Sequence, residues 1–401
     1  MSRVETTTNF RDSNGADLGK KLITKDYLIS VYPSIGEQIG IPPELWTWGN
    51  GDEGRLGINI VTNKFTPVTT FAGGTNWKQV SSGSRYCAAI KTDGTLWTWG
   101  LGTYGQLGDN TATNKLTPVT TFAGGTNWKQ VSSGYKHCAA IKTDGTLWTW
   151  GRGADGQLGD NTVTDKSTPV TTFAGGTNWK QVSSGGAQCA AIKTDGTLWT
   201  WGLGTYGQLG DNTITNKSTP VTTFAGGTNW KQVSSGGAHC AAIKTDGTLW
   251  TWGNGSYGRL GINTITSKFT PVTTFAGGTN WKQVSGGNRH CAAIKTDGTL
   301  WTWGNGSYGQ LGDNTITNKS TPVTTFAGGT NWKQVSSGGN HCAAIKTDGT
   351  LWTWGRGTDG QLGDNTVTTK STPVTTFAGG TNWKQVSGGY RHCAAIKSVD
   401  F

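Results

Sequence analysis

Hydrophobic and polar residues alternate along short segments of this chain, and the pattern returns every 51 residues. The segment Leu-Trp-Thr-Trp-Gly occurs seven times, with its first tryptophan at positions 46, 97, 148, 199, 250, 301 and 352. Alternation with a period of two is typical of β-strands, whose successive side chains point to opposite faces of a sheet. A repeat length near 50 residues is typical of propellers and solenoids.

One repeat illustrates the strands that we expect in all of them. These strands are Trp128–Ser133, His137–Lys142, Leu147–Trp150 and an outer strand at Thr168–Thr172. Asp144-Gly145 predicts a two-residue hairpin turn between the second and third strands, because such turns need positive φ. A proline, Pro169, suits an edge strand, where no ladder donor is missed.

The alternation also sorts side chains by size. We expect Trp148 and Trp150 to share one face of the blade, and Cys138 and Ala140 to share a face on the neighbouring strand. Both faces of a propeller blade are buried between neighbouring blades. Small residues therefore leave room for the large rings.

The two ends of the chain carry complementary parts of a repeat. The first repeat begins at Leu45–Trp48, a third strand, and the last repeat stops after Cys393–Lys397, a second strand. Their pairing would complete a blade and remove the exposed edges. The sequence thus predicts an all-β fold: residues 44–401 form a closed seven-bladed β-propeller with four antiparallel strands per blade, after a separate segment, residues 1–43.

Composition narrows the functional classes. The chain has 21 Trp and 64 Gly, which is too aromatic for a disordered low-complexity chain. Its net charge of +11 comes from lysines spread around the repeats, whereas nucleic-acid binders gather charge into a stripe, so we do not expect nucleic-acid binding. No apolar run is long enough to span a membrane, and no secretory signal opens the chain, so we expect no membrane contact and no secretion.

The repeats resemble those of the regulator of chromosome condensation family. The matching residues in one repeat are Gly134, His137, Ala140, Ile141, Gly145, Leu147, Trp150, Gly151, Gly153, Gly156, Gln157, Leu158 and Gly159. Two repeats have Tyr86 and Gln188 at the position of His137. Two repeats have Arg55 and Arg259 at the position of Gln157. The resemblance implies a seven-bladed propeller but no single function, since members act as exchange factors, ubiquitin-ligase parts, receptors and scaffolds. The founding member uses inserted loops for nucleotide exchange on a small GTPase, and this chain has no insertions.

Several motifs suggest chemistry that their context does not favour. Gly100–Gly105 matches the dinucleotide fingerprint, but no helix is expected after it, so we expect no cofactor. His-Cys pairs such as His137-Cys138 occur five times, one to a blade, so their ligands would not converge, and we expect no metal. The seven Cys are expected to be free and buried, although a ring of histidines around the channel stays open. No unique catalytic set appears, so we expect no enzyme.

Differences between the repeats gather in two short windows, one before the cysteine and one after Trp-Gly. In a four-stranded meander both connections lie at the same end of the blade, so they predict one variable face. That face is rich in Tyr and Arg, which dominate binding hot spots, and we expect it to bind a protein or a glycan. Drift in tolerant loops is the alternative explanation. The candidate binding residues are Arg85, Tyr86, Tyr104, Tyr135, Arg152, Tyr206, Tyr257, Arg289, Tyr308, Arg356, Tyr390 and Arg391.

Residues 1–43 share nothing with the repeats. We expect Thr6–Gly19 to be irregular, Lys20–Ile23 to be a strand and Lys25–Tyr32 to be a helix. The helix would present a small apolar face for docking on the propeller or on a protein partner, formed by Tyr27, Leu28, Val31 and Tyr32. The phrase DLGKKLITKDYLISVYPSI resembles leader segments of virion proteins from marine tailed phages.

Together these features predict a non-enzymatic binding or structural propeller displayed by an anchoring segment. The leader resemblance favours a phage virion surface or host-attachment protein. The alternative is a cytosolic regulator of the guanine-nucleotide-exchange or scaffold type, which would place the chain in the cytoplasm.

Overall fold

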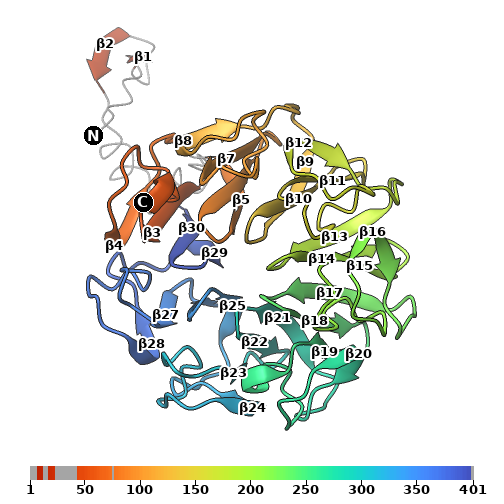
Figure 1. Cartoon of the computed structure of the whole chain (residues 1–401). Helices are drawn as coiled ribbons and strands as arrows, with labels where there is room; N and C mark the ends of the chain where they lie inside the picture. Colours follow the sequence, from red (N-terminus) through yellow and green to blue (C-terminus); the bar gives the residue numbers. More distant parts are fainter. Residues whose placement is uncertain (1–6, 12–16, 23–42, 75, 399–401) are drawn as a thin grey trace.

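Seven blades surround a central channel (Figure 1). The computed structural model describes residues 7–11, 17–22, 43–74 and 76–398. Over residues 43–398 it contains seven four-stranded antiparallel sheets, in which the strand closest to the channel comes first in each blade. The predicted all-β propeller is therefore confirmed.

We number the blades from the one that joins the two ends of the propeller. Blade 1 contains β29 (Trp383–Gly388), β30 (His392–Lys397), β3 (Glu44–Gly49) and β4 (Lys64–Thr69). Blade 2 contains β5 (Trp77–Ser82), β6 (Tyr86–Lys91), β7 (Leu96–Gly100) and β8 (Lys115–Thr120). Blade 3 contains β9 (Trp128–Ser133), β10 (His137–Lys142), β11 (Leu147–Gly151) and β12 (Lys166–Thr171). Blade 4 contains β13 (Trp179–Ser184), β14 (Gln188–Lys193), β15 (Leu198–Gly202) and β16 (Lys217–Thr222).

The remaining blades repeat this order. Blade 5 contains β17 (Trp230–Ser235), β18 (His239–Lys244), β19 (Leu249–Gly253) and β20 (Lys268–Thr273). Blade 6 contains β21 (Trp281–Gly286), β22 (His290–Lys295), β23 (Leu300–Gly304) and β24 (Lys319–Thr324). Blade 7 contains β25 (Trp332–Ser337), β26 (His341–Lys346), β27 (Leu351–Gly355) and β28 (Lys370–Thr375). Two short 3₁₀ turns, η1 (Asp52–Gly54) and η2 (Ser256–Gly258), lie in blades 1 and 5.

Blade 1 closes the ring as the chain ends predict. Strand β3 pairs antiparallel with β30, and the partners include Leu45 with Ile396 and Trp48 with Cys393. The side-chain bonds that join every other pair of neighbouring blades also join blade 1 to blade 2. Val80 N donates to Gln385 Oε1 at 2.9 Å, and Gln385 Nε2 donates to Val80 O at 3.2 Å. Blade 1 is therefore a complete four-stranded sheet that is bonded to blade 2 in the same way as the other neighbouring blades are bonded to each other.

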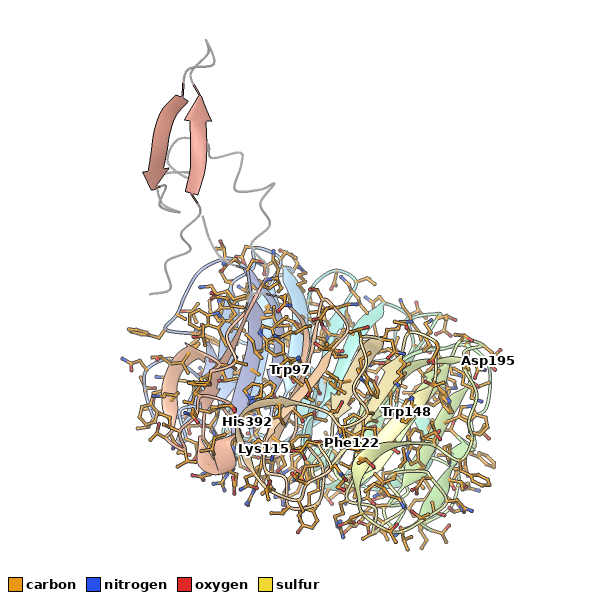
Figure 2. The ribbon with its side chains drawn as sticks, turned by 90° about the horizontal axis from the view of Figure 1, so that it is seen from above. Trp97, Lys115, Phe122, Trp148, Asp195 and His392 are labelled. Atoms are coloured by element: carbon orange, nitrogen blue, oxygen red, sulfur yellow. The ribbon has the colours of Figure 1, made fainter. Side chains whose placement is uncertain are left out.

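The hydrophobic core is divided among the seven contacts between neighbouring blades. At one of them, Trp179 and Trp201 of blade 4 pack against Ile141 and Leu147 of blade 3. Register places Cys138 opposite Trp150 and Ala140 opposite Trp148, so the predicted sharing of faces is confirmed. Figure 2 shows Trp97 and Trp148 within the body of the ring. Each blade thus presents tryptophans together with small Cys and Ala residues on one face, and residues such as Ala139, Ile141 and Leu147 on the other.

The turn between the second and third strands differs from the prediction. Lys142 N donates to Thr146 O at 3.0 Å, and Gly145 N donates to Lys142 O at 3.0 Å. These bonds enclose a three-residue loop, 143–145, in which only Gly145 has a positive φ, of 82°. A type I turn followed by a left-handed glycine fits this geometry, because the two-residue alternative would need positive φ at Asp144 as well.

Residues before the propeller include a hairpin that the sequence did not predict. Strand β1 (Thr7–Arg11) pairs antiparallel with β2 (Asp17–Leu22), so the expectation of an irregular Thr6–Gly19 is wrong. The strand expected at Lys20–Ile23 overlaps the end of β2. The helix expected at Lys25–Tyr32, with its docking residues, lies outside the described residues. Among the described residues, no helix is long and apolar enough to cross a membrane.

Candidate binding face

The two variable windows meet at one end of the blades, as predicted. Within blade 2, Leu101 N donates to Arg85 O at 2.9 Å, and the equivalent bond recurs in the other blades. Side chains then join one blade to the next: Lys136 Nζ donates to the Tyr104 hydroxyl at 3.0 Å. We call this surface the variable face. It consists of residues 50–53, 84–86, 101–104, 135–137, 152–155, 186–188, 203–206, 237–239, 254–257, 288–290, 305–308, 339–341, 356–359 and 390–392.

Eleven of the twelve candidate binding residues reach the surface of this face. Tyr206, Tyr257 and Tyr308 are 48%, 37% and 42% exposed. Arg85 and Arg289 are exposed too. The half-buried candidates are Tyr104, Tyr135, Arg152, Arg356, Tyr390 and Arg391.

Tyr86 is the exception, and its place on a binding surface is a wrong prediction. The side chain is fully buried and belongs to the core cluster between blades 2 and 3. Its hydroxyl donates to the carbonyl of His137. Tyr86 is the first residue of β6 rather than part of the loop, and it occupies the position that holds a buried histidine in five other blades. That positional match was the signal available in the sequence.

Those histidines bond to a cysteine of the next blade, not to the adjacent cysteine in the chain. His137 Nε2 lies 3.1 Å from Cys189 Sγ, and His290 Nε2 lies 3.1 Å from Cys342 Sγ. Burial lowers the pKa of His137 to about 4 and raises the pKa of Cys189 to about 12, so both groups are neutral at pH 7. In the described part of the chain, no three His, Cys, Asp or Glu side chains gather into a metal-binding group. The pairs therefore join blades, and no histidine lines the channel because all five are fully buried.

Two tyrosines and an asparagine gather where the channel opens on the variable face. Tyr135 and Tyr390, from blades 3 and 1, meet edge to face with ring centroids 5.9 Å apart. The Tyr135 hydroxyl donates to Asn288 Oδ1 of blade 6 at 2.5 Å. All three side chains line a cavity of about 150 Å³ together with serines and glycines from all seven blades. Burial raises the pKa of Tyr135, so its phenol stays protonated.

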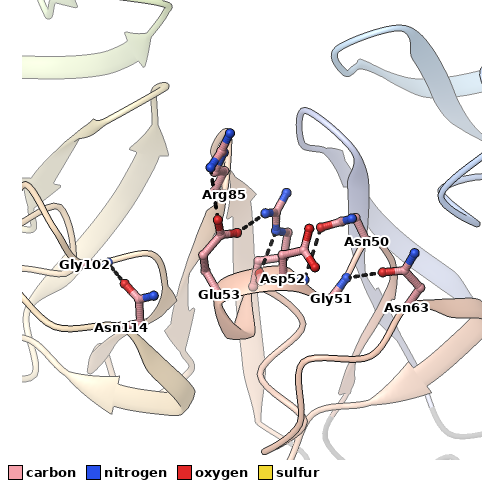
Figure 3. A network of polar contacts seen from close by, with 9 residues as sticks. Asn50, Gly51, Asp52, Glu53, Asn63, Arg85, Gly102 and Asn114 are labelled. Atoms are coloured by element: carbon pink, nitrogen blue, oxygen red, sulfur yellow. Dashed lines mark hydrogen bonds and ion pairs between the residues drawn. The ribbon is translucent and has the colours of Figure 1, made fainter.

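The glycine-rich segment that resembles a dinucleotide fingerprint has a structural explanation. The amide of Gly102 donates to Asn114 Oδ1 at 3.0 Å (Figure 3). Gly105 N donates to Gly102 O at 2.7 Å. Gly105 has a φ of +73°, and a Cβ there would lie 2.6 Å from Ser167 Cα of the next blade. The glycines therefore permit a tight loop packed against its neighbour, and the amides of Gly102 and Gly105 are already bonded within the loop.

At the junction of blades 1 and 2, a carboxylate joins two arginines (Figure 3). Glu53 forms an ion pair with Arg55, and its other oxygen lies 3.0 Å from Arg85 Nη1. The buried Arg55 also donates from Nε to Asp52 O at 2.9 Å. Burial lowers the pKa of Arg55, and Glu53 opposes that shift. The carboxylate therefore stabilises a guanidinium that is only 3% exposed.

Blades 5 and 6 repeat this arrangement without the carboxylate. Arg259 is 5% exposed and donates from Nε to Ser256 O at 3.0 Å. Tyr257 stands where blade 1 has Glu53, and its ring centroid lies 5.5 Å from Arg259 Cζ and 5.2 Å from Arg289 Cζ. Within the described residues, no ion pair includes Arg259 or Arg289. The sequence shows Arg259 only as a replacement of the glutamine found in five other repeats, and it did not predict the cluster of Arg259, Tyr257 and Arg289.

Comparison with known proteins agrees with the fold. The chain is 33% identical over 325 residues to the ultraviolet-B receptor UVR8 of Arabidopsis thaliana, covering 79% of this chain and 74% of the relative. It is 27% identical to the regulator of chromosome condensation of Xenopus laevis, over 90% of this chain and 89% of that one. The crystal structure of yeast RCC1 (Prp20) bound to Kap60 superposes with a TM-score of 0.80 at 18% identity, covering 90% of each chain.

The family of this chain is shown by a family model that matches most of its length. The family model for the RCC1-like domain matches residues 44–398, which includes every blade. The named relatives are a receptor and a regulator, and both names describe binding or regulation rather than a chemical reaction. This chain is therefore a member of the RCC1-like domain family.

Proposed function

We propose that this protein is a non-catalytic propeller that binds a protein partner through its variable face. The observation that carries the proposal is the gathering of repeat differences in the loops of that face, with further differences in the lead-in to the fourth strand (residues 58–65 in blade 1), while the segment FAGGTNWKQV is identical in all seven repeats. Loops on a rigid scaffold are where binding residues concentrate. The exposed residues there include Tyr206, Tyr308 and Arg289, which are residue types common in binding hot spots.

Regulation is the role that the relatives favour. The two relatives named above act as a receptor and as a regulator, and the Xenopus protein matches this chain along 89% of its length. A cytosolic regulator or scaffold is therefore better supported than a virion component. The virion and host-attachment role stays a prediction based on residues 1–43, and no observation on the described residues favours it.

Site-specific photo-cross-linking tests the proposal with matched positions. The photoreactive amino acid p-benzoylphenylalanine is placed at Tyr206 or Tyr308 on the variable face, and at Phe224 or Phe326 in the connections that follow β16 and β24. All four native side chains are exposed, and each pair comes from the same blade. Each variant is illuminated in lysate from the source cells, and cross-linked proteins are identified by mass spectrometry.

The expected result is one protein that cross-links at 206 and 308 but not at 224 and 326. Cross-linking of the same protein at 224 and 326 alone would overturn the proposal. Recovery of glycans instead of a protein in lectin-type binding assays would also contradict it.

A further inference from the structure

We propose that Arg259, Arg289 and Tyr257 form a site for a carboxylate, supplied by an acidic side chain of a protein partner. The inference rests on the proposed function, because the partner occupies the variable face. The chain holds its own comparison for this site, since blades 1 and 2 contain the same arrangement with the carboxylate present.

The loops that carry the two arrangements have the same backbone. Glu53 and Tyr257 have φ values of 56° and 64°, in the left-handed region that non-glycine residues seldom adopt. The arginine that follows has φ and ψ of −60° and −15° at Arg55, and −62° and −12° at Arg259. Each arginine donates from Nε to the carbonyl three residues before it, at 2.9 Å and 3.0 Å. The two guanidinium groups are therefore held in equivalent positions.

The next blade supplies the second arginine in both arrangements. Arg85 and Arg289 follow Glu53 and Tyr257 by the same 32 residues. Arg85 Nη1 donates to Glu53 Oε1 at 3.0 Å, whereas Arg289 Nη1 lies 3.4 Å from the Tyr257 hydroxyl. In blade 1, one carboxylate thus accepts from both arginines. In blade 5, a phenol ring lies near both cations instead and brings no charge.

Charge around Arg259 is left uncompensated within the described residues. Burial lowers its pKa, and the neighbouring Arg289 lowers it further, with no carboxylate acting in the other direction. Blades 1 and 5 both also lack the usual aspartate of the repeat, because Ile58 and Ile262 stand at the position of Asp109 in blade 2. Asp109 pairs with Lys115 at 3.2 Å, while Lys268, the matching lysine of blade 5, has no ion pair in the described part of the chain.

A buried cation is costly unless an anion or several hydrogen bonds stabilise it. Glu53 shows which chemical group fits the gap between these arginines: a planar carboxylate that accepts from both. Tyr257 and Arg289 are exposed, so a ligand can reach the cluster from solution. The site also adjoins the channel mouth, because Arg259 Nη1 lies 3.5 Å from the carbonyl of Asn288.

Peptide binding by the full chain tests this site. The probe is a fluorescein-labelled tetraglutamate peptide, and its affinity is measured by fluorescence anisotropy at low salt. Arg259→Gln installs the residue of five other blades, and Tyr257→Glu installs the internal carboxylate of blade 1. Lys231→Gln is the control, because it removes one charge from an exposed residue of β17 in the same blade. Thermal unfolding midpoints verify that each variant is folded.

The expected result is a loss of about tenfold or more for Arg259→Gln and for Tyr257→Glu, and less than about twofold for the control. Conversely, Glu53→Tyr should raise the stoichiometry measured by calorimetry from one peptide to two. Equal losses of peptide affinity in Arg259→Gln, Tyr257→Glu and Lys231→Gln would mean that the peptide binds by general electrostatic attraction, and would contradict the proposed site. Competition by inorganic phosphate but not by acetate would contradict a carboxylate ligand.

This outcome is separable from that of the proposed function. Peptide binding that survives Tyr257→Glu disproves the carboxylate site even if cross-linking at Tyr206 and Tyr308 identifies a partner. A partner that cross-links only at Phe224 and Phe326 disproves the binding face even if the peptide binds at Arg259.

Discussion

Acid should weaken the ring through its buried histidines, and His341 offers the cleanest case. Its Nε2 bonds to Cys393 Sγ at 3.1 Å across the junction between blades 7 and 1, and its Nδ1 has no partner within the described residues. Burial lowers its pKa from the ordinary 6.5 to about 4. Above pH 6.5 the His341 imidazole is neutral in both the folded and the unfolded chain, so its titration does not lower the free energy of unfolding. As the pH falls from 6.5 toward 4, the unfolded chain binds a proton that the folded chain does not, and stability is lost.

The size of this loss follows from the gap between the two pKa values. A gap from 6.5 to about 4 corresponds to roughly 3 kcal/mol when fully developed, and to roughly 2.5 kcal/mol at pH 4.5. Replacing the histidine with glutamine removes this titration, and Gln188 shows that an amide fits the position, donating to Gly236 O at 2.9 Å. The penalty of His341→Gln in unfolding free energy should therefore be smaller by roughly 2.5 kcal/mol at pH 4.5 than at pH 7.5.

Denaturant unfolding followed by tryptophan fluorescence, at both pH values and equal ionic strength, measures the difference. Carboxylates titrate alike in both proteins, so their contribution cancels. The reverse change, Gln188→His, adds a sixth buried histidine and should increase the sensitivity to acid. A penalty that is the same at both pH values would refute the reasoning, because it would mean that His341 is not held neutral by burial.

Three further changes test the packing of the blades. Trp201→Ala should cost about 3–5 kcal/mol in unfolding free energy, because Trp201 is fully buried between blades 3 and 4, and a loss below about 1 kcal/mol would contradict that burial. Gly145→Ala should destabilise the protein far more than Gly124→Ala. A Cβ at Gly145 would lie 2.0 Å from Thr177 O, whereas a Cβ at Gly124 would have no surrounding atom within 4 Å. Equal thermal midpoints for the two variants would disprove this prediction. Tyr86→Phe should cost about 0.5–1.5 kcal/mol, because it removes one hydrogen bond from a His137 carbonyl that still accepts from Gly134 N, while Tyr86→His, the residue of five other blades, should stay close to wild type in the same unfolding assay.

Strands and closure were predictable because each depends on a local pattern repeated seven times. The expected segments Trp128–Ser133 and His137–Lys142 coincide with β9 and β10. The outer strand starts earlier than expected, since β12 begins at Lys166 rather than Thr168. Its first residues pair through a register shift between Thr149 and Gly151, which alternation alone does not reveal.

Contacts between blades could not be read from the sequence. Spacing placed His137 beside Cys138, but the bonded cysteine is Cys189, because the ring geometry brings it from the next blade. The same limit applies to Arg259, whose neighbours Tyr257 and Arg289 come from two blades. Tyr86 was assigned to the surface by residue type, whereas its position at the start of β6 determines its burial. Repeat differences predicted the variable face, and packing determines which of its side chains are exposed.

The binding affinity of the cross-linked partner for two matched variants tests the central claim most directly. One variant replaces Tyr206, Tyr257, Arg289 and Tyr308 of the variable face with alanine, and the other replaces Phe173, Phe224, Phe275 and Phe326 with alanine. All eight side chains are exposed, so neither change removes core packing. We predict that the dissociation constant rises by about 30-fold or more for the first variant and stays within about threefold for the second. An unchanged constant for the first variant, with a large increase for the second, would contradict the account.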